Sequence, residues 1–390
     1  MAKNLFIAAT GKDVGKSTIS FALIDALKKH GKRVGFMKPV GQRWLPTQWG
    51  EVEEDVILMK EHFGFGEAPL DMNPVVIKRG YTEEYLNKVI KPDLSSSIIR
   101  GYQKVAKDKD YVVIEGTGHA GVGSVLNKSN ADVAQLLNAK VVLLVKGGIG
   151  SAIDRLELNR VFFEQQGVRV LGVIANKVIP TKYDKVKRAL EQYCAAKKLK
   201  LYGVIPYSSI LSNPTLGQVI EELKPTVLHD TNEHDAVIDS FTVGASSLDE
   251  FIEFVKQKEG NMLLIFPTSR TDITFAIPNL KKCIDMSNKR TLTILFSGRN
   301  KPSDAAVTIL KDENVTVLWK KGDTFSLISS LSSISIKTRP KDNFKIDEIK
   351  RMVMKNIQYK QILSRLTTVP IQHGRMHSIK ERVRNLLHFN

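Results

Sequence analysis

Six short apolar runs in the first 206 residues constrain the fold more than any other feature of the sequence. The runs are rich in Val, Ile and Leu, and longer segments with a helical spacing of apolar residues separate them. They are NLFIAAT (4–10), RVGFMK (33–38), DYVVIE (110–115), KVVLLV (140–145), VRVLGVIAN (168–176) and LYGVIP (201–206). Such runs suit strands that are buried on both faces of a parallel sheet. The alternation therefore predicts an α/β fold with a doubly wound, mostly parallel sheet.

The segment between the first strand and the first helix, IAATGKDVGKSTIS (7–20), has the composition of a phosphate-binding loop. Backbone N–H groups and the start of a helix face an anion in such a loop. Lys16 would reach the β- and γ-phosphates of a nucleotide, and the hydroxyl of Ser17 would bind Mg²⁺. The pattern G-x-x-x-x-G-K-[ST] is incomplete, because Thr10 occupies the first glycine position. The alternative is a helix N-terminus that polar residues cap.

Three acidic or basic residues follow at or near other strand ends, where doubly wound sheets bind their ligands. Lys38 ends the second run and would add positive charge for a γ-phosphate or an anionic substrate. Glu115 ends the third run, at a position typical of a magnesium-side acid. Asp55 is a further metal-side candidate, and the alternative for its neighbours Glu53 and Glu54 is helix capping.

Asn176 and Lys177 end the fifth run. The carboxamide of Asn176 offers a donor and an acceptor that match the edge of a purine. A residue of this type is equally common in turns, so the sequence leaves both interpretations open.

Composition indicates an ordinary globular chain of 390 residues with a formal net charge of +17. The basic residues are spread along helical segments and mixed with acids, which favours a solvated surface over a nucleic-acid partner. The two cysteines, Cys194 and Cys283, have no metal-ligand spacing. No run approaches the length of a membrane span, and the first strand begins at Leu5, which leaves no room for a leader. We expect a cytoplasmic protein without a membrane partner.

Five segments in order carry a family resemblance: TGKDVGKST, FMKPVGQ, VVIEGTG, GVIANKV and GVIPYSSIL. Together they resemble the dethiobiotin synthetase-like branch of P-loop proteins, which includes the cobyrinic acid amide synthases. Within it, the chain is most similar to the domain at the front of long bacterial phosphate acetyltransferases. The resemblance covers residues 1–224 and implies the cofactors ATP and Mg²⁺.

The resemblance also assigns roles to residues of this sequence. Lys16 and Lys38 would act on the transferring phosphoryl group, and Asn176 would read adenine. Ser17, Asp55 and Glu115 would lie on the magnesium side. The nucleotide would contact Thr10, Gly11, Lys12, Asp13, Val14, Gly15, Lys16, Ser17, Thr18, Asn176 and Lys177. The stretch Gly41-Gln42-Arg43-Trp44 departs from the small, hydroxyl-bearing stretch of dethiobiotin synthetases, so biotin synthesis is not implied.

Residues 225–340 alternate strand and helix again and resemble the DRTGG domain, which predicts a second, smaller α/β unit. Arg270, Thr271 and Asp272 stand where that motif lies, but its paired glycines are absent, and Ile273 and Thr274 are found instead. A packing and dimerisation module is therefore the preferred interpretation. Residues 341–390 would form a C-terminal helix and a basic tail. No acyl-transferring domain is recognisable there, so we do not expect phosphate acetyltransferase activity from this chain.

Two classes of function fit these patterns. In the first, nucleotide binding and slow ATP hydrolysis switch a regulatory or accessory protein. In the second, the chain is an ATP-dependent ligase or synthetase that phosphorylates a small carboxylate or carbamate for capture by an amine. Relatives of this branch commonly pair, so the resemblance also implies a homodimer.

Overall fold

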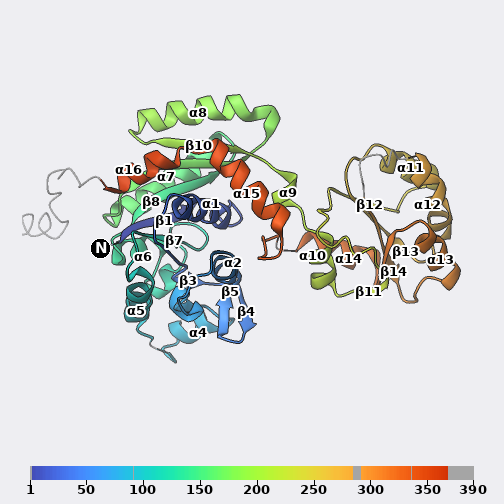
Figure 1. Ribbon diagram of the computed structural model, residues 1–390, viewed down its shortest axis with the longest axis horizontal. Coiled ribbons are helices and arrows are strands. Elements are labelled where there is room, and N and C mark those ends of the chain that lie inside the picture. The colour runs from blue at the N-terminus through green and yellow to red at the C-terminus, as the bar shows by residue number, and fades with distance from the viewer. Residues whose placement is uncertain (1, 91, 284–290, 335, 368–390) are drawn as a thin grey trace, which may run out of the picture.

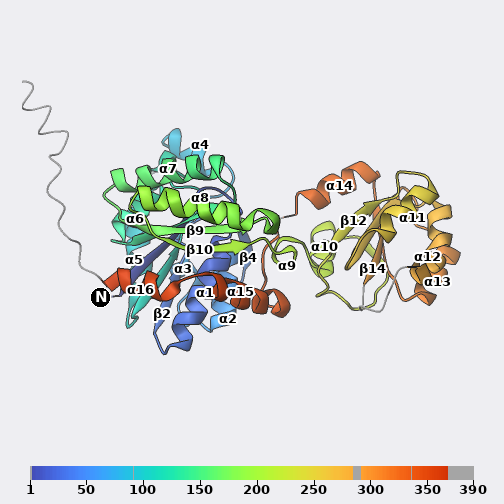
Figure 2. The same ribbon diagram turned by 90° about the horizontal axis from the view of Figure 1, so that it is seen from above.

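A computed structural model describes residues 2–90, 92–283, 291–334 and 336–367 of the chain. Two α/β bodies lie side by side along the long axis of the molecule, joined by segments that run out and back (Figure 1). The last two helices return to the first body, so that body contains both early and late parts of the chain (Figure 2). None of the helices in the described part of the chain combines the length and the apolar composition of a membrane span.

The first body is built on a six-stranded sheet of order β10-β9-β8-β1-β7-β2, in which all neighbours are parallel. Its strands are β1 (Lys3–Ala9), β2 (Val34–Met37), β7 (Tyr111–Glu115), β8 (Lys140–Lys146), β9 (Val170–Val178) and β10 (Leu201–Pro206). Most of their side chains are buried on both faces. The prediction of a mostly parallel, doubly wound sheet is confirmed.

Helices cover both faces of this sheet (Figure 2). One face carries α1 (Lys16–Lys29), α15 (Asn343–Asn356) and α16 (Tyr359–Thr367), and the other carries α5 (Leu94–Ala106), α6 (Asn130–Leu136), α7 (Gly150–Gln165) and α8 (Tyr183–Ala196). The apolar side chains of α15 and α16, among them Ile346, Val353 and Ile362, belong to the core of the first body. The late helices therefore complete this core.

A small insertion follows β2 and lies near the carboxyl end of that strand. It contains the pairs β3 (Val40–Gly41) with β6 (Val75–Val76) and β4 (Trp44–Thr47) with β5 (Gly50–Glu53). It also contains α2 (Glu54–Phe63), α3 (Pro69–Met72) and α4 (Tyr81–Leu86). The insertion brings the acidic start of α2 close to the end of β2.

The second body is a five-stranded sheet of order β11-β15-β14-β13-β12. Strands β12 (Ser240–Val243), β13 (Met262–Pro267), β14 (Leu292–Gly298) and β15 (Thr316–Lys321) are parallel, and β11 (Thr226–His229) is antiparallel to β15. Helices α11 (Leu248–Lys256), α12 (Thr271–Cys283) and α13 (Asp304–Asp312) pack on one face, and α10 (Leu216–Leu223) and α14 (Thr324–Ser332) pack on the other. The smaller α/β unit expected from the sequence is confirmed.

The domain limits drawn from the sequence remain predictions, but two packing relations bear on them. Helix α10 precedes the limit at 224, yet Leu216, Val219 and Leu223 lie in the core of the second body. Residues 343–367 pack on the first body although they follow the second in the sequence. The basic tail expected after them, residues 368–390, lies outside the described residues. The short helix α9 (Ser209–Ser212) and residues 336–342, here called the return segment, make the two crossings between the bodies.

Candidate nucleotide site

The turn between β1 and α1 has the backbone of a phosphate-binding loop. Gly15, directly before α1, adopts a left-handed conformation with φ of 105°, and no side chain caps the helix. A Cβ at Gly15 would lie 2.2 Å from Nδ2 of Asn176, so only glycine fits there. The first N–H groups of α1 therefore face the cavity, where the helix dipole favours an anion.

Lys16 begins α1, and its ammonium bridges this turn to the loop after β7. Its Nζ atom donates to the carbonyl oxygens of Gly11 at 3.4 Å and Gly118 at 3.3 Å. Burial lowers the pKa of Lys16, and nearby Glu115 opposes this shift. Among the described residues, the hydrogen bonds of this ammonium go to neutral carbonyl groups, which an anionic phosphate can replace.

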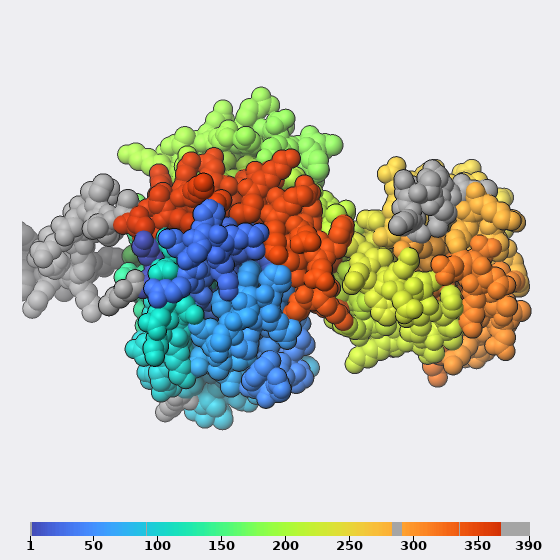
Figure 3. All heavy atoms as spheres, in the orientation of Figure 1, coloured from blue at the N-terminus to red at the C-terminus, as the bar shows by residue number. Residues whose placement is uncertain are grey.

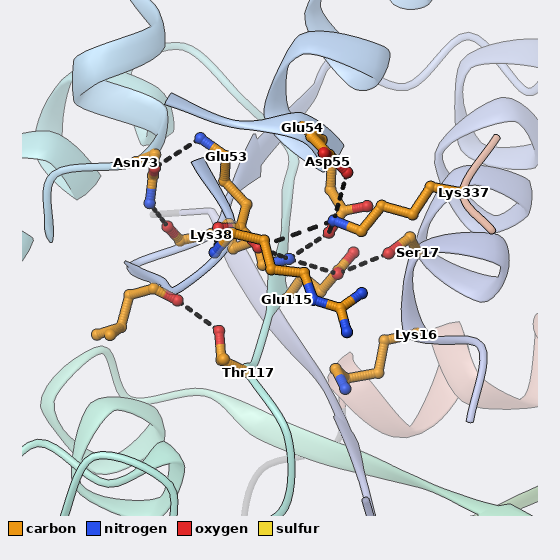
Figure 4. A network of polar contacts seen from close by, with 12 residues as sticks. Lys16, Ser17, Lys38, Glu53, Glu54, Asp55, Asn73, Glu115, Thr117 and Lys337 are labelled. Carbon is orange, nitrogen blue, oxygen red and sulfur yellow. Dashed lines mark hydrogen bonds and ion pairs between the residues drawn. The ribbon is translucent and has the colours of Figure 1, made fainter. Parts of the chain in front are cut away.

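Lys38, at the carboxyl end of β2, is buried among three carboxylates (Figure 4). Its Nζ atom lies 2.9 Å from Oε1 of Glu53 and 3.4 Å from Oε1 of Glu115, and it also pairs with Asp55. Asn73 fixes this arrangement, because its carboxamide donates to the carbonyl of Lys38 and accepts from the backbone N–H of Glu53. The sequence placed Lys38, Asp55 and Glu115 near one another, and the geometry brings them into contact.

The pKa values of this cluster follow from burial and opposite charge. Burial alone would lower the pKa of Lys38, but Asp55, Glu115 and Glu53 outweigh it and raise that pKa. Burial would likewise raise the pKa of Asp55, whereas Lys38 and Lys337 together lower it. The pKa of Glu115 is raised by burial and by Asp55, despite the nearby Lys38. Lys38 and Lys337 therefore hold Asp55 in its carboxylate form.

Glu115 and Ser17 fit the magnesium side of a nucleotide site. The hydroxyl of Ser17 donates to Oε1 of Glu115 at 2.9 Å, while Oε2 of Glu115 is buried without a hydrogen-bond partner among the described residues. Across the part of the chain that the structure describes, no three acidic, histidine or cysteine side chains could hold a metal alone. Mg²⁺ commonly takes one or two carboxylates and completes its shell with phosphates and water. The side-chain oxygen atoms of Ser17, Glu115 and Asp55 suit this kind of Mg²⁺ coordination.

The other residues expected at the nucleotide lie around the same turn. Lys12, Asp13, Gly15, Thr18 and Lys177 line the cavity, whereas Thr10 and Val14 are buried behind it. The carboxamide of Asn176 donates to the carbonyl of Val14 at 2.8 Å and accepts from the backbone of Lys177. Asn176 thus braces the phosphate loop, and its contact with adenine stays a prediction.

The cavity has a volume of about 420 Å³ and extends beyond the phosphate loop. Pro206 at the end of β10 lines it, together with Ser208, Leu211 and Ser212 at the outgoing crossing around α9. Ile336, Lys337 and Thr338 of the return segment line it as well. Helix α15 contributes Ile349 and Met352. In the space-filling view, the red atoms of the late helices lie against the blue atoms of the early ones (Figure 3). Both chain crossings therefore form part of the wall.

Three residues of this polar cluster were not recognised in the sequence as part of a site. Glu53 stands at the N-terminal position of α2 but makes no cap, and its carboxylate pairs with Lys38 instead. Asn73 lies in a loop whose sequence contains no pattern that indicates a role in a site. Lys337 enters from beyond the second body, and its Nζ atom lies 3.2 Å from Oε2 of Glu54 and 3.3 Å from Oδ2 of Asp55.

The residues that stand at the position of the DRTGG motif connect two elements of the second body. The guanidinium of Arg270 donates to the carbonyl oxygens of Gly244 and Ser246, both at 2.9 Å, and pairs with Asp272. These bonds tie the end of β12 to the start of α12.

Comparison with known families supports the two-part organisation. The profile of the AAA domain matches residues 3–215, and that of the DRTGG domain matches residues 218–334. The phosphate acetyltransferase of Nitratidesulfovibrio vulgaris is 23% identical over 376 residues, which are 94% of this chain and 52% of that protein. The chain thus spans about half the length of such relatives.

Two further similarities each cover about half of this chain. The ATP-dependent dethiobiotin synthetase of Methanococcus vannielii is 23% identical over 194 residues, covering 48% of this chain and 88% of that protein. Among solved structures, the cobyrinic acid a,c-diamide synthase of Mycobacterium smegmatis, with bound ADP and magnesium, is 15% identical with a TM-score of 0.35. That match covers 53% of this chain and 88% of the other.

Proposed function

Because the chain belongs to the AAA domain family, in its dethiobiotin synthetase-like P-loop branch, and continues into a DRTGG domain, we propose that it is a nucleotide-dependent switch. MgATP occupies the cavity beside Lys16, and the second body responds to its presence. Slow hydrolysis of ATP resets the switch. In this role the chain regulates or assists a partner protein, or another part of a longer protein to which it belongs.

The observation that carries this proposal is the composition of the cavity wall. The outgoing crossing at Ser208 and Leu211 and the return segment at Lys337 both line the cavity. A ligand that fills the cavity therefore contacts both connections to the second body. A change in those contacts changes the relative stability of different positions of the second body, which is the requirement for a switch.

Residues of the chain have distinct tasks in nucleotide binding. The start of α1 and Lys16 bind phosphate oxygens, and Ser17, Glu115 and Asp55 provide oxygen ligands on the metal side. Mg²⁺ would neutralise phosphate charge and orient the terminal phosphate. Lys38 is already matched by Glu53, Asp55 and Glu115, so it balances the acidic groups instead of offering a free positive charge.

An ATP-dependent ligase is the second candidate, and the similarity to a dethiobiotin synthetase favours it. In that reaction the γ-phosphoryl group passes to a substrate carboxylate and ADP leaves. An amine nitrogen then attacks the acyl phosphate and releases inorganic phosphate. The close pairing of Lys38 with three carboxylates favours the switch, because a synthetase would need such a lysine for its substrate.

ATP turnover separates the two candidates. ADP and phosphate release should be slow and should not change when a panel of small carboxylates and diamines is added. Marked stimulation by one member of the panel would instead support the ligase. We also propose that the chain is a homodimer without a nucleic-acid partner, which light scattering and salt-dependent retention on a phosphate-rich column would test.

The position of the second body can be followed directly with two labels. Leu158 on α7 and Phe325 on α14 have side chains that are largely exposed, one on each body. Burial raises the pKa of Cys194 to about 11, so its thiol is a poor nucleophile. In a Cys283→Ser background, Leu158→Cys and Phe325→Cys would carry the labels. We expect the distance distribution to change on addition of MgATP, and an unchanged distribution would contradict a switch.

A further inference from the structure

Lys337 joins the nucleotide site to the second body through two separate parts of the same residue. Its side chain reaches Glu54 and Asp55 of the first body (Figure 4). Its backbone carbonyl accepts a hydrogen bond of 2.6 Å from the carboxamide of Gln218, in the first turn of α10. Helix α10 packs in the core of the second body. A single residue therefore connects the carboxylates of the cavity with that core.

The return segment is anchored to α10 by further polar contacts. Arg339 pairs with Glu221 of α10, and the ammonium of Lys341 lies 2.6 Å from the same carboxylate. The carboxylate of Asp342 accepts from the backbone N–H of Arg339 at 2.9 Å. The segment thus follows α10, while the side chain of Lys337 points into the first body.

Lys337 and a metal ion bound at Asp55 would compete for the same carboxylate. Oδ2 of Asp55 contacts both Lys38 and Lys337. A divalent cation at Asp55 would lie close to both ammonium groups and would repel them. Lys38 cannot easily leave, because it is buried and also pairs with Glu53 and Glu115. The side chain of Lys337 is 20% exposed and comes from a segment without helix or strand, so it can move.

We propose that Lys337 is a tethered cation that occupies the acidic side of the nucleotide site and leaves Asp55 when a metal-bound nucleotide enters. This inference rests on the proposed function and specifies how occupancy of the cavity is passed to the second body. Departure of the ammonium removes one contact between the return segment and the first body, while the carboxamide of Gln218 stays bonded to the backbone carbonyl of Lys337. The DRTGG domain is then released from one of its contacts with the P-loop domain.

Binding of Mn²⁺ alone, followed by its electron paramagnetic resonance signal, tests the competition without any turnover. In the full chain, Lys337→Ala removes the competing charge and should bind Mn²⁺ about fivefold more tightly, as expected for loss of a partly exposed ion pair. Lys337→Arg keeps the charge and should bind as the wild type does. Lys341→Ala is the matched control, because this lysine of the same segment pairs with Glu221 outside the cavity. Equal or weaker Mn²⁺ binding by Lys337→Ala overturns the proposal.

MgATP binding by the same variants separates this inference from the proposed function. If neither the wild type nor Lys337→Ala binds MgATP, the proposed function itself fails. If the wild type binds MgATP and Lys337→Ala binds it no more tightly, only the role of Lys337 is overturned.

Amide hydrogen exchange gives a second test that needs no variant. In the wild type, the N–H groups of Arg339 and Asp342 are hydrogen-bonded within the return segment. They should exchange faster after addition of MgATP, because release of Lys337 loosens the segment. Unchanged or slower exchange at these two amides contradicts the release.

Discussion

The ammonium of Lys337 lies 3.3 Å from the carboxylate of Asp55, although 282 positions separate the two residues in the sequence. The contact exists because the chain leaves the first body at the edge of the cavity, forms the second body and returns beside the same cavity. The last helices then complete the core of the first body. The second body is therefore an insertion whose two ends both lie at the nucleotide site.

Replacement of Lys38 by methionine should lower the free energy of unfolding by about 3–5 kcal/mol, because buried carboxylates lose their partner. The carboxylates concerned are Glu53, Asp55 and Glu115. Urea denaturation followed by circular dichroism measures the change. Lys104→Met is the matched control, since Lys104 forms an exposed pair with Asp71 and should cost less than about 1 kcal/mol. Similar losses in both variants would argue against the buried cluster.

Replacement of Gly15 by alanine should abolish MgATP binding, because the added Cβ would meet the carboxamide of Asn176 at 2.2 Å. The side chain of Asn176 would have to leave Val14, which would disturb the phosphate loop. Gly31→Ala is the control, since Gly31 also has a positive φ but its Cβ would meet nothing within 4 Å. It should cost about 1–2 kcal/mol of stability and leave binding intact. Retained binding in Gly15→Ala would show that the loop geometry is not required.

Titration of Lys345 should increase the free energy of unfolding as the pH rises through the alkaline range. Its side chain is buried, and burial lowers its pKa to about 8 in the folded chain from 10.5. Between these values the unfolded chain binds more protons, so the free energy of unfolding increases as pH rises. The gain should approach about 3 kcal/mol for this shift. Below about pH 8 the cost of burying the charge is fully present.

Lys345→Met lacks this titration, so its unfolding free energy should rise less with pH than that of the wild type. Urea denaturation at about pH 7.5 and about pH 10 compares the two slopes. Because Lys345 donates to the carbonyl of Asn213 at 2.7 Å, the variant also loses a hydrogen bond at both pH values. That loss cancels in the comparison of slopes. Parallel slopes would contradict a lowered pKa for Lys345.

The sheet of the first body was predictable because parallel strands that are buried on both faces need continuous apolar runs. The proximity of Lys38 and Glu115 was predictable for a related reason. Strands β2 and β7 are neighbours, and their carboxyl ends meet at one edge of the sheet. Lys16 and Ser17 followed from the short-range pattern of the phosphate loop. These features depend on residues that are close in sequence or on adjacent strand ends.

The remaining contacts of the site join residues that are far apart in the sequence. Lys337 reaches Asp55 only because residues after 342 pack on the first body, and a local pattern carries no such information. Glu53 has the sequence position of a helix cap, but the buried ammonium of Lys38 is the stronger partner for its carboxylate. The sequence suggested that Asn176 contacts a purine. The structure adds a second role, because its carboxamide donates a hydrogen bond to the carbonyl of Val14 in the phosphate loop.

Calorimetric titration with MgATP is the most direct test of the central claim that this cavity binds a nucleotide. The wild type should bind MgATP at one site per chain, and Lys16→Ala should weaken binding at least about tenfold, a change of about 1.4 kcal/mol. Lys29→Ala is the matched control, because Lys29 lies at the far end of α1 and pairs with Asp25. Absence of binding by the wild type, or equal binding by Lys16→Ala, would contradict a nucleotide site at this loop.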